Sequence, residues 1–211
     1  YCIISNGAAV YDAAEKKTVL RDEIPMERAI EVCEYMDTLP VIYYSYHADS
    51  GWISRGQYEV VEQYMPKVLL PDFYRVSKPV DDLKEDIRRR GGGVQKLQMH
   101  FRDPQERQRQ LKEFPERFPE LMMTTSIPTN IEINSMGANK GAALRGLCAY
   151  LGIDPADTVA FGDGSNDISM LREAGVGVAM ANAEPEVKAA ADVVTDSNND
   201  AGVAKMIRKL I

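Results

Sequence analysis

Two aspartates stand four residues apart in the stretch FGDGSNDISM, residues 161–170. Asp163 follows the apolar run Thr158–Phe161 almost directly, and Asn166 and Asp167 come just behind it. Carboxylate oxygens are the hard ligands that Mg²⁺ takes, usually one or two of them together with waters and substrate phosphate oxygens. The same residue types also end strands and cap helices. This stretch alone therefore leaves a metal site and a structural turn both open.

A calcium loop is a third interpretation, and it can be tested on the spacing. Asp163, Ser165 and Asp167 match the first three ligand positions of an EF-hand loop. The sixth position needs a glycine and holds Ile168, and the twelfth needs a bidentate acid and holds Ala174. The EF-hand interpretation is therefore excluded.

The elements around the two aspartates favour a ligand site. Thr158–Phe161 is typical of a short buried strand, and Ser165–Ala174 of a helix closed by Gly175. The carboxyl end of a parallel strand is where open α/β sheets bind their ligands. The positive end of the following helix would face the same crevice, and the amide of Asn166 suits a phosphate oxygen there.

A lysine supplies the second feature, in the segment GANKG at 137–141. The apolar spacing over Asn139–Leu151 predicts a helix ended by Gly152, which puts Lys140 in its first turn. A cation at the positive end of a helix weakens that helix slightly unless an anion shares the site. With a phosphate present, lysine and helix amides would converge on it. The alternative is a lysine whose long stem carries the ammonium into solvent.

The rest of the carboxyl-terminal part alternates helix and strand patterns, as parallel βαβ units require. Its strands are short, apolar and without alternation, which is typical of a sheet covered by helices on both faces. The further expected elements are a strand at Val176–Met180, a helix opened by Pro185, a strand at Asp192–Thr195 and a helix capped by Asp200 that runs to Ile211.

Residues 11–134 show a different pattern of expected strands and helices, which is typical of an α+β domain. The runs at 41–46 and 52–54 predict an antiparallel hairpin turning at His47–Gly51. The other expected elements are helices at 26–36, 57–64, 80–90 and 104–113 and strands at 94–101, 121–125 and 130–134. We therefore expect an inserted α+β domain at 11–134 and a core formed by 1–10 and 135–211.

Composition narrows the classes of function. A formal net charge of −7 over 211 residues argues against a nucleic-acid or anionic membrane surface but allows a local basic pocket for a small anion. Three widely spaced cysteines favour reduced thiols, and no apolar run approaches the length of a membrane span. These features indicate a cytoplasmic protein, and they give no indication of its oligomeric state.

Taken together, these segments resemble a known family. A lysine at the start of a helix, NKGAAL, followed by one strand and GDGSND, resembles two motifs of the haloacid dehalogenase superfamily. With SNGAAVYD, IEINSMGANKGAAL, VGVAMANA and SNNDAGVA added, the chain is similar to the Cof-like sugar-phosphatase branch. The resemblance covers the whole chain, is most specific in the last third and is weaker across the insert.

This resemblance implies an α/β fold, with a Rossmann-like parallel sheet between helices and an α+β cap that closes over the site. It implies a Mg²⁺-dependent phosphohydrolase for small phosphorylated metabolites, sugar phosphates above all. Asp163 would bind Mg²⁺ directly, and Asp167 directly or through water. Lys140 would orient phosphate and nucleophile, and Asn166 would contact phosphate.

In that family an aspartate of a DxDGT-type motif attacks the phosphate monoester, and water hydrolyses the resulting aspartyl-phosphate. No Asp-x-Asp-Gly occurs in these 211 residues. We therefore expect this chain to be a piece of a longer phosphatase, inactive without the missing segment. A non-catalytic phosphate-binding or regulatory module and a phosphomutase are the alternatives.

Overall fold

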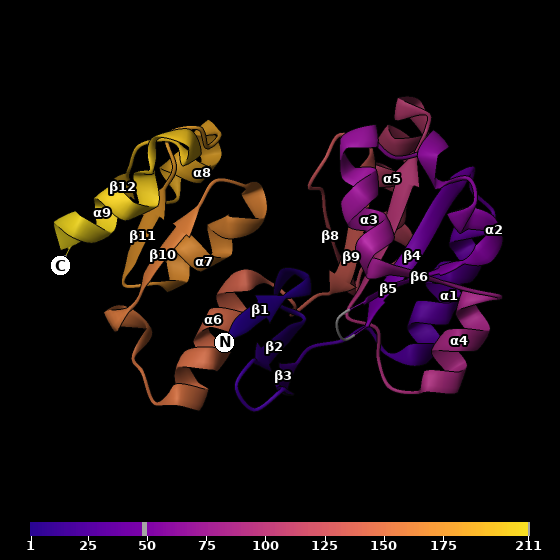
Figure 1. Ribbon diagram of the computed structural model, residues 1–211, viewed down its shortest axis with the longest axis horizontal. Coiled ribbons are helices and arrows are strands. Elements are labelled where there is room, and N and C mark those ends of the chain that lie inside the picture. The colour runs from indigo at the N-terminus through magenta and orange to yellow at the C-terminus, as the bar shows by residue number, and fades with distance from the viewer. Residues whose placement is uncertain (48–49, 211) are drawn as a thin grey trace. The chain divides into compact units, whose positions relative to one another are not determined.

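The computed structural model describes residues 1–47 and 50–210. The chain forms two compact units, shown in Figure 1. Unit 1 combines both ends of the chain, Tyr1–Arg21 and Gly137–Ile211, and unit 2 is the inserted segment Asp22–Met136. No helix in the described part of the chain is long and apolar enough to cross a membrane.

The first boundary lies further along the chain than the expected position between residues 10 and 11. That position falls inside β2 (Ala9–Asp12), which pairs antiparallel with β1 (Cys2–Ile4) and with β3 (Lys17–Arg21). β3 was not expected from the sequence. These three strands form a separate sheet in unit 1 because hairpin pairing keeps β2 and β3 beside β1.

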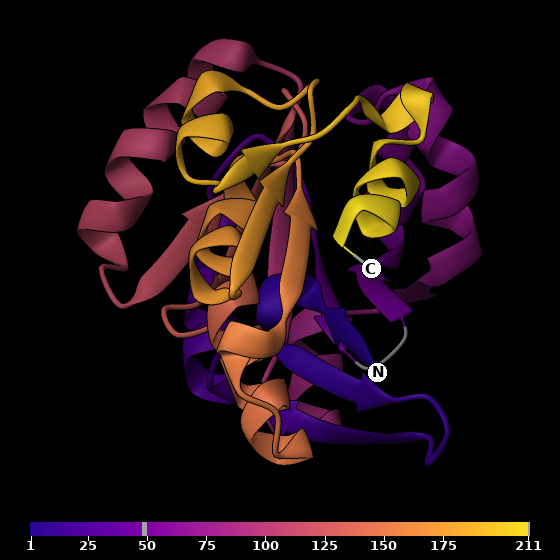
Figure 2. The ribbon, with the colours of Figure 1, turned by 90° about the vertical axis from the view of Figure 1, so that its left-hand side faces the viewer.

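The second sheet of unit 1 is parallel, with strand order β10 (Val159–Gly162), β11 (Val176–Ala179) and β12 (Val193–Val194). Figure 2 shows α7 (Ile168–Glu173) and α8 (Pro185–Ala189) on one side of it and α9 (Gly202–Leu210) on the other. The predicted parallel sheet with helices on both faces is thus present here. Parallel pairing brings the carboxyl ends of all three strands to the same edge.

Local chemistry explains the helix ends in unit 1. The helix α6 (Lys140–Leu151) begins at Asn139, whose Oδ1 accepts from Ala142 N at 2.9 Å, and it ends at Gly152 with φ +69°. The helix expected from Ser165 instead begins as a 3-10 turn, Ser165–Asp167, ahead of α7.

The prediction that Asp200 caps the last helix was also wrong. Asp200 belongs to a separate 3-10 turn, Asn198–Asp200, and α9 begins after it. Ala201, in the left-handed conformation with φ +55°, separates the two.

Unit 2 contains a six-stranded sheet in the order β6-β5-β4-β7-β9-β8. Every neighbouring pair is antiparallel except β5 with β6. The predicted hairpin is confirmed as the pair β4–β5, whereas Ala48 and Asp49 of its turn lie outside the described residues. The strands are β4 (Val41–His47), β5 (Ser50–Ser54), β6 (Ser77–Val80), β7 (Lys96–Phe101), β8 (Leu121–Thr124) and β9 (Asn130–Ser135).

Helices cover both faces of this sheet. On one face α1 (Met26–Met36), α4 (Leu83–Arg90) and α5 (Pro104–Arg117) pack over apolar side chains that include Tyr43 and Leu97. On the other, α2 (Arg55–Tyr58), α3 (Leu70–Val76) and two short turns pack over Ile42 and Tyr44. The β4 sequence lacks polar alternation because alternate side chains enter two different cores.

The helix expected over 57–64 was wrong. The chain instead forms α2 and a 3-10 turn at Val61–Gln63, and α3 and β6 follow where no element was expected. Pro66 and Pro71 interrupt the apolar periodicity in this segment, so its short helices leave no regular pattern in the sequence.

His100 on β7 is a buried titratable group in unit 2, with 1% of its surface exposed. Burial lowers the pKa of its imidazole to about 4, although Glu132 raises it and Lys96 lowers it further. His100 is therefore neutral at pH 7, and the folded state must either protonate a buried ring or unfold as the pH falls.

We expect the free energy of unfolding to fall between pH 7 and pH 5 by about 2 kcal/mol on account of His100 alone. The unfolded imidazole binds a proton near pH 6.5, whereas the folded one does so only near pH 4, so acid favours the unfolded chain. Urea unfolding of wild type and His100→Gln at both pH values isolates this contribution. His47→Asn is the matched control and should show the same change in unfolding free energy between pH 7 and pH 5 as wild type. If His100→Gln also shows the wild-type change, the assignment to His100 is wrong.

Candidate functional site

Three loops meet at the carboxyl edge of the parallel sheet, one after each strand. Asp163 follows β10, Asn182 follows β11 and Asn198 follows β12. Oδ2 of Asp163 accepts from Nδ2 of Asn198 at 2.8 Å and from Nδ2 of Asn182 at 3.3 Å. Asn198 N also donates to Asn182 Oδ1 at 3.0 Å. Two neutral amides thus orient an exposed carboxylate without placing a competing cation beside it.

Asp167 is buried and holds the turn after β10 closed. Its Oδ2 accepts from the backbone N–H groups of Asp163 and Gly164, both at 3.0 Å. Its Oδ1 lies 2.5 Å from Nζ of Lys140. Asp167 therefore satisfies two amides of the turn and also makes a charged contact to the predicted lysine.

The pKa of Asp167 is lower than that of an ordinary aspartate. Burial raises the pKa, but the hydrogen bond from Lys140 and those from the Gly164 and Asp163 amides lower it by more in total. Asp167 is consequently an anion at neutral pH, and its charge is fully engaged within the protein.

Close packing of α6 against α7 positions Lys140. Gly141 N donates to Ser169 Oγ at 3.1 Å, and a Cβ at Gly141 would lie 2.4 Å from the carbonyl oxygen of Ser169. Only a glycine allows this approach. A lysine in the first turn of a helix is favourable where an anion lies beside it, and Asp167 is such an anion.

Several residues of this site line a cavity of about 400 Å³ within unit 1. Its polar wall includes Asp163, Asp167 and Lys140 from the prediction, together with Asn6 and Asn198. Its apolar wall consists of Ile3, Phe161, Met170, Met180 and Val203.

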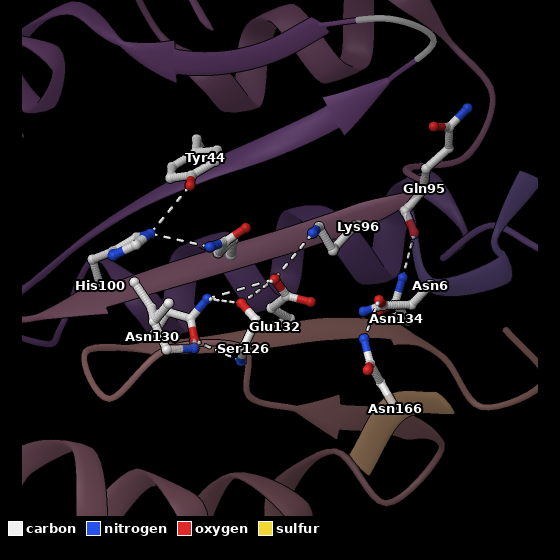
Figure 3. Close-up of polar contacts among 12 residues, drawn as sticks. Asn6, Tyr44, Gln95, Lys96, His100, Ser126, Asn130, Glu132, Asn134 and Asn166 are labelled. Atoms are coloured by element: carbon white, nitrogen blue, oxygen red, sulfur yellow. Dashed lines mark hydrogen bonds and ion pairs between the residues drawn. The ribbon is translucent and has the colours of Figure 1, made fainter. Parts of the chain in front are cut away.

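The predicted Asn166 lies beside this wall. Its Nδ2 is 3.4 Å from Oδ1 of Asn6. Figure 3 draws this contact. The fold thus brings Asp163, Asp167 and Lys140 to one cavity and joins Asn166 to a polar residue of that cavity.

Asn6, Asn182 and Asn198 were not predicted as site residues. Asn6 and Asn182 come within two residues of an apolar run that reads as a strand, in the segments IISNG and VAMAN, whereas Asn198 comes four residues after Val194. The rule that located Asp163, a polar residue at the carboxyl end of a strand, could have located Asn6 and Asn182.

The donor atoms at this edge fit a hard cation better than a soft one. Asp163 and Asp167 offer carboxylate oxygens only, and the described residues contain no group of three or more His, Cys, Asp or Glu side chains arranged to hold a metal. Oδ1 of Asp163 has no hydrogen-bond partner among the described residues, whereas both oxygens of Asp167 are engaged. The Asp163 carboxylate could hold Mg²⁺ at this edge, with water and phosphate oxygens completing the coordination of the ion.

Comparison with known proteins identifies the family. The haloacid dehalogenase-like hydrolase family model matches residues 1–207. The chain belongs to this family. The predicted resemblance at superfamily level is therefore correct, and the matched region includes both units.

Three relatives illustrate the range of similarity. The 5-amino-6-(5-phospho-D-ribitylamino)uracil phosphatase of Bacillus subtilis is 53% identical over 89 residues, which are 42% of this chain and 36% of that one. A haloacid dehalogenase-like hydrolase from Bacteroides thetaiotaomicron superposes with a TM-score of 0.81 at 25% identity over 98% of this chain and 74% of that one. A sugar phosphatase of subclass IIB gives a TM-score of 0.77 at 25% identity, over 97% and 73%.

The ion pair between half-buried Lys140 and buried Asp167 should contribute to stability as well as to chemistry. We expect Lys140→Met to lower the free energy of unfolding by about 2 kcal/mol, because it leaves the Asp167 carboxylate buried without its cation. The double variant Lys140→Met with Asp167→Asn should recover part of this loss in urea titrations. Lys205→Met, which breaks the exposed Lys205–Asp196 pair, is the control and should change little. Additive effects of Lys140→Met and Asp167→Asn would contradict the coupling.

Gly162 allows Asp167 to lie against the end of β10. A Cβ at Gly162 would lie 2.4 Å from Cβ of Asp167. We expect Gly162→Ala to destabilise the fold by about 2 kcal/mol by displacing Asp167, measured by thermal or urea unfolding. Gly56→Ala, where a Cβ meets open space, is the control and should be neutral or slightly stabilising. A neutral Gly162→Ala would show that the turn is not tightly packed.

Proposed function

We propose that this protein is a Mg²⁺-dependent phosphatase that hydrolyses monoesters of small phosphorylated metabolites, with sugar phosphates as the best substrate class. The observation that carries the proposal is the convergence of Asp163, Asp167 and Lys140 on one cavity at the carboxyl edge of a parallel sheet. Family membership and the names of the matched phosphatases support it.

In this proposal Asp163 holds the metal, because its carboxylate is exposed and oriented through one oxygen only. Asp167 acts as the second acidic residue, through water rather than directly, since Lys140 and two amides engage its oxygens. When bound, Mg²⁺ would neutralise charge on the phosphate and so favour nucleophilic attack.

Lys140 would hold the phosphate. Its ammonium carries three donors, of which Asp167 needs one, so the others can contact phosphate oxygens entering the cavity. The Asp167 carboxylate also keeps the ammonium directed toward this edge of the sheet. Asn166, beside Asn6, would donate an amide hydrogen to the same phosphate.

The proposed chemistry needs a carboxylate nucleophile. One of its oxygens attacks phosphorus, the bond from phosphorus to the ester oxygen breaks, and the alcohol leaves after taking a proton; water then hydrolyses the acyl phosphate. The family's Asp-x-Asp-Gly motif is not among these 211 residues. We therefore assign the activity to the protein as its gene encodes it and propose that the nucleophile lies outside this chain.

Unit 2 would be the cap that selects the leaving group. It is inserted between the two segments of unit 1, which is the arrangement that a separate specificity domain requires. Residues 137–211 and 1–21 would then supply the phosphate chemistry, and residues 22–136 the recognition of the remainder of the substrate.

A second candidate is a non-catalytic module that binds a phosphorylated ligand. The donors of Lys140 that Asp167 leaves free at the unit 1 cavity would serve ligand binding without catalysis equally well. Such a module would keep the phosphate contacts of Lys140 and Asn166 but release no phosphate. Binding without turnover by the protein as encoded would identify it.

The test is phosphate release from a panel of sugar phosphates with and without Mg²⁺. We expect activity that requires Mg²⁺ and that falls by at least about 100-fold in Asp163→Asn, because the amide loses the negative charge that holds the metal. Asp157→Asn, an exposed aspartate in unit 1, is the matched control and should keep wild-type activity. Full activity of Asp163→Asn, or activity unchanged by chelation of Mg²⁺, would reject the metal assignment.

A further inference from the structure

The short turn after β1 has an unusual backbone. Ser5, Asn6 and Gly7 all have positive φ, at +51°, +60° and +104°. This region is open to glycine and accessible to asparagine, but it is unfavourable for serine. Among the described residues, the other non-glycine residues with positive φ, Lys16 and Ala201, occur singly. A run of such residues persists only where the surrounding structure enforces it, so neighbouring elements must hold this turn in place.

Gly7 packs the turn against the start of α6. A Cβ at Gly7 would lie 2.3 Å from the carbonyl oxygen of Asn139 and 3.2 Å from Cβ of Ala143. Asn139 caps α6 and directly precedes Lys140. The turn therefore contacts the end of α6 that carries the lysine, and Asn6 and Lys140 line the same cavity in unit 1.

The side chain of Asn166 is held from two sides. Its Oδ1 lies over Gly164, where an added Cβ would come within 2.9 Å of it. On the other side, its Nδ2 is 3.4 Å from Oδ1 of Asn6. Figure 3 shows the two asparagine side chains pointing toward one another. The absence of a side chain at Gly164 and the acceptor at Asn6 together place the nitrogen of this amide, and not its oxygen, beside a residue of the cavity wall.

The Asn166 amide can help to bind phosphate in only one of its two orientations. Nδ2 carries two hydrogens to donate, whereas Oδ1 can only accept. Phosphate oxygens are negatively charged acceptors, so a flipped amide would present its oxygen to them and repel them. With one hydrogen of Nδ2 directed to Asn6, the second remains for a phosphate oxygen. An acceptor at Asn6 therefore selects the orientation that is useful for binding.

We propose that Asn6 is a positioning residue of the phosphate site, whose Oδ1 holds the Asn166 amide with its nitrogen directed toward the phosphate. The turn at 5–7, packed against α6, fixes Asn6 for this task. The inference rests on the phosphate contact proposed for Asn166. It gives the segment SNG a part in that contact, although the two asparagines are 160 residues apart in sequence.

The backbone conformation by itself offers a simpler reason for an asparagine at position 6. Asparagine enters the left-handed region more readily than most residues. Glycine enters it more readily still, and it has no side-chain acceptor. Asn6→Gly therefore keeps the turn and removes the amide, so it separates a role in the turn from a role in the site.

The experiment measures binding of inorganic phosphate, in the presence of Mg²⁺, to the protein as its gene encodes it by titration calorimetry. We expect Asn6→Gly to weaken phosphate binding by about tenfold, because one hydrogen bond to a charged group loses its orientation. Its midpoint of thermal unfolding should not fall. Lys16→Gly is the matched control and should bind phosphate as wild type does. Lys16 has φ +52°, is exposed and does not line the cavity.

A double-variant cycle shows whether Asn6 acts through Asn166. Asn166→Ala should weaken phosphate binding at least as much as Asn6→Gly, and the double variant should bind no more weakly than Asn166→Ala alone. In NMR spectra, Asn6→Gly should shift the side-chain amide signals of Asn166, and Lys16→Gly should leave them in place. Multiplied effects in the double variant, or wild-type phosphate binding by Asn6→Gly, would overturn the inference.

Phosphate binding does not require turnover, so this inference and the phosphatase proposal can fail separately. Binding that depends on Asn6, without phosphate release from sugar phosphates, would reject the catalytic proposal only. If phosphate is released, Asn6→Gly should raise KM by about tenfold with little change in kcat, because a contact to phosphate acts in the ground state and the transition state alike. Unchanged KM in Asn6→Gly would reject the positioning role only, and so would a lack of phosphate binding by wild type at about 100 mM.

Discussion

The Asp167 carboxylate is the contact on which the rest of the candidate site depends. It accepts two backbone amides of the turn after β10 and pairs with Lys140 at the start of α6, so it joins two elements that are 27 residues apart in sequence. A buried carboxylate without these partners would be costly, and breaking such a pair costs more than an exposed pair would. The turn, the lysine and the exposed Asp163 are consequently fixed relative to one another.

The parallel topology of the unit 1 sheet brings the loops that surround Asp163 together. Strands β10, β11 and β12 end at one edge, and the residue or loop after each strand contributes to the same small region. Asp163 therefore receives both of its amide contacts from loops that are 19 and 35 residues away in sequence. Neutral donors suit this position, because a charged one would compete with a cation for the carboxylate.

The charges around the unit 2 cavity are arranged differently from those in unit 1. The second sheet face of unit 2 buries a lysine, a glutamate and a neutral histidine around a cavity whose charges cancel. In unit 1 one oxygen of the exposed Asp163 has no hydrogen-bond partner among the described residues, whereas in unit 2 the charges are matched within the wall.

Local pattern was sufficient for the elements with regular periodicity. The α6 helix, the short strands near the carboxyl terminus and the β4–β5 hairpin follow from apolar spacing and, for α6, from a terminal Gly152. The choice of Asp163, Asp167 and Lys140 followed from residue type and from their place at element ends. The helices between Arg55 and Val76 did not follow, because prolines and short lengths remove the period on which such predictions rest.

The sequence by itself determined the α/β class of the last third, its family and three of the residues that line the unit 1 cavity. Only the tertiary structure decided that the anion beside Lys140 is Asp167, that Asn182 and Asn198 share one oxygen of Asp163, and that His100 and Glu132 are buried. These are contacts between segments distant along the chain. Their existence depends on register, on the direction of packing and on close approach at glycines such as Gly141, and none of these is encoded in a local pattern of residues.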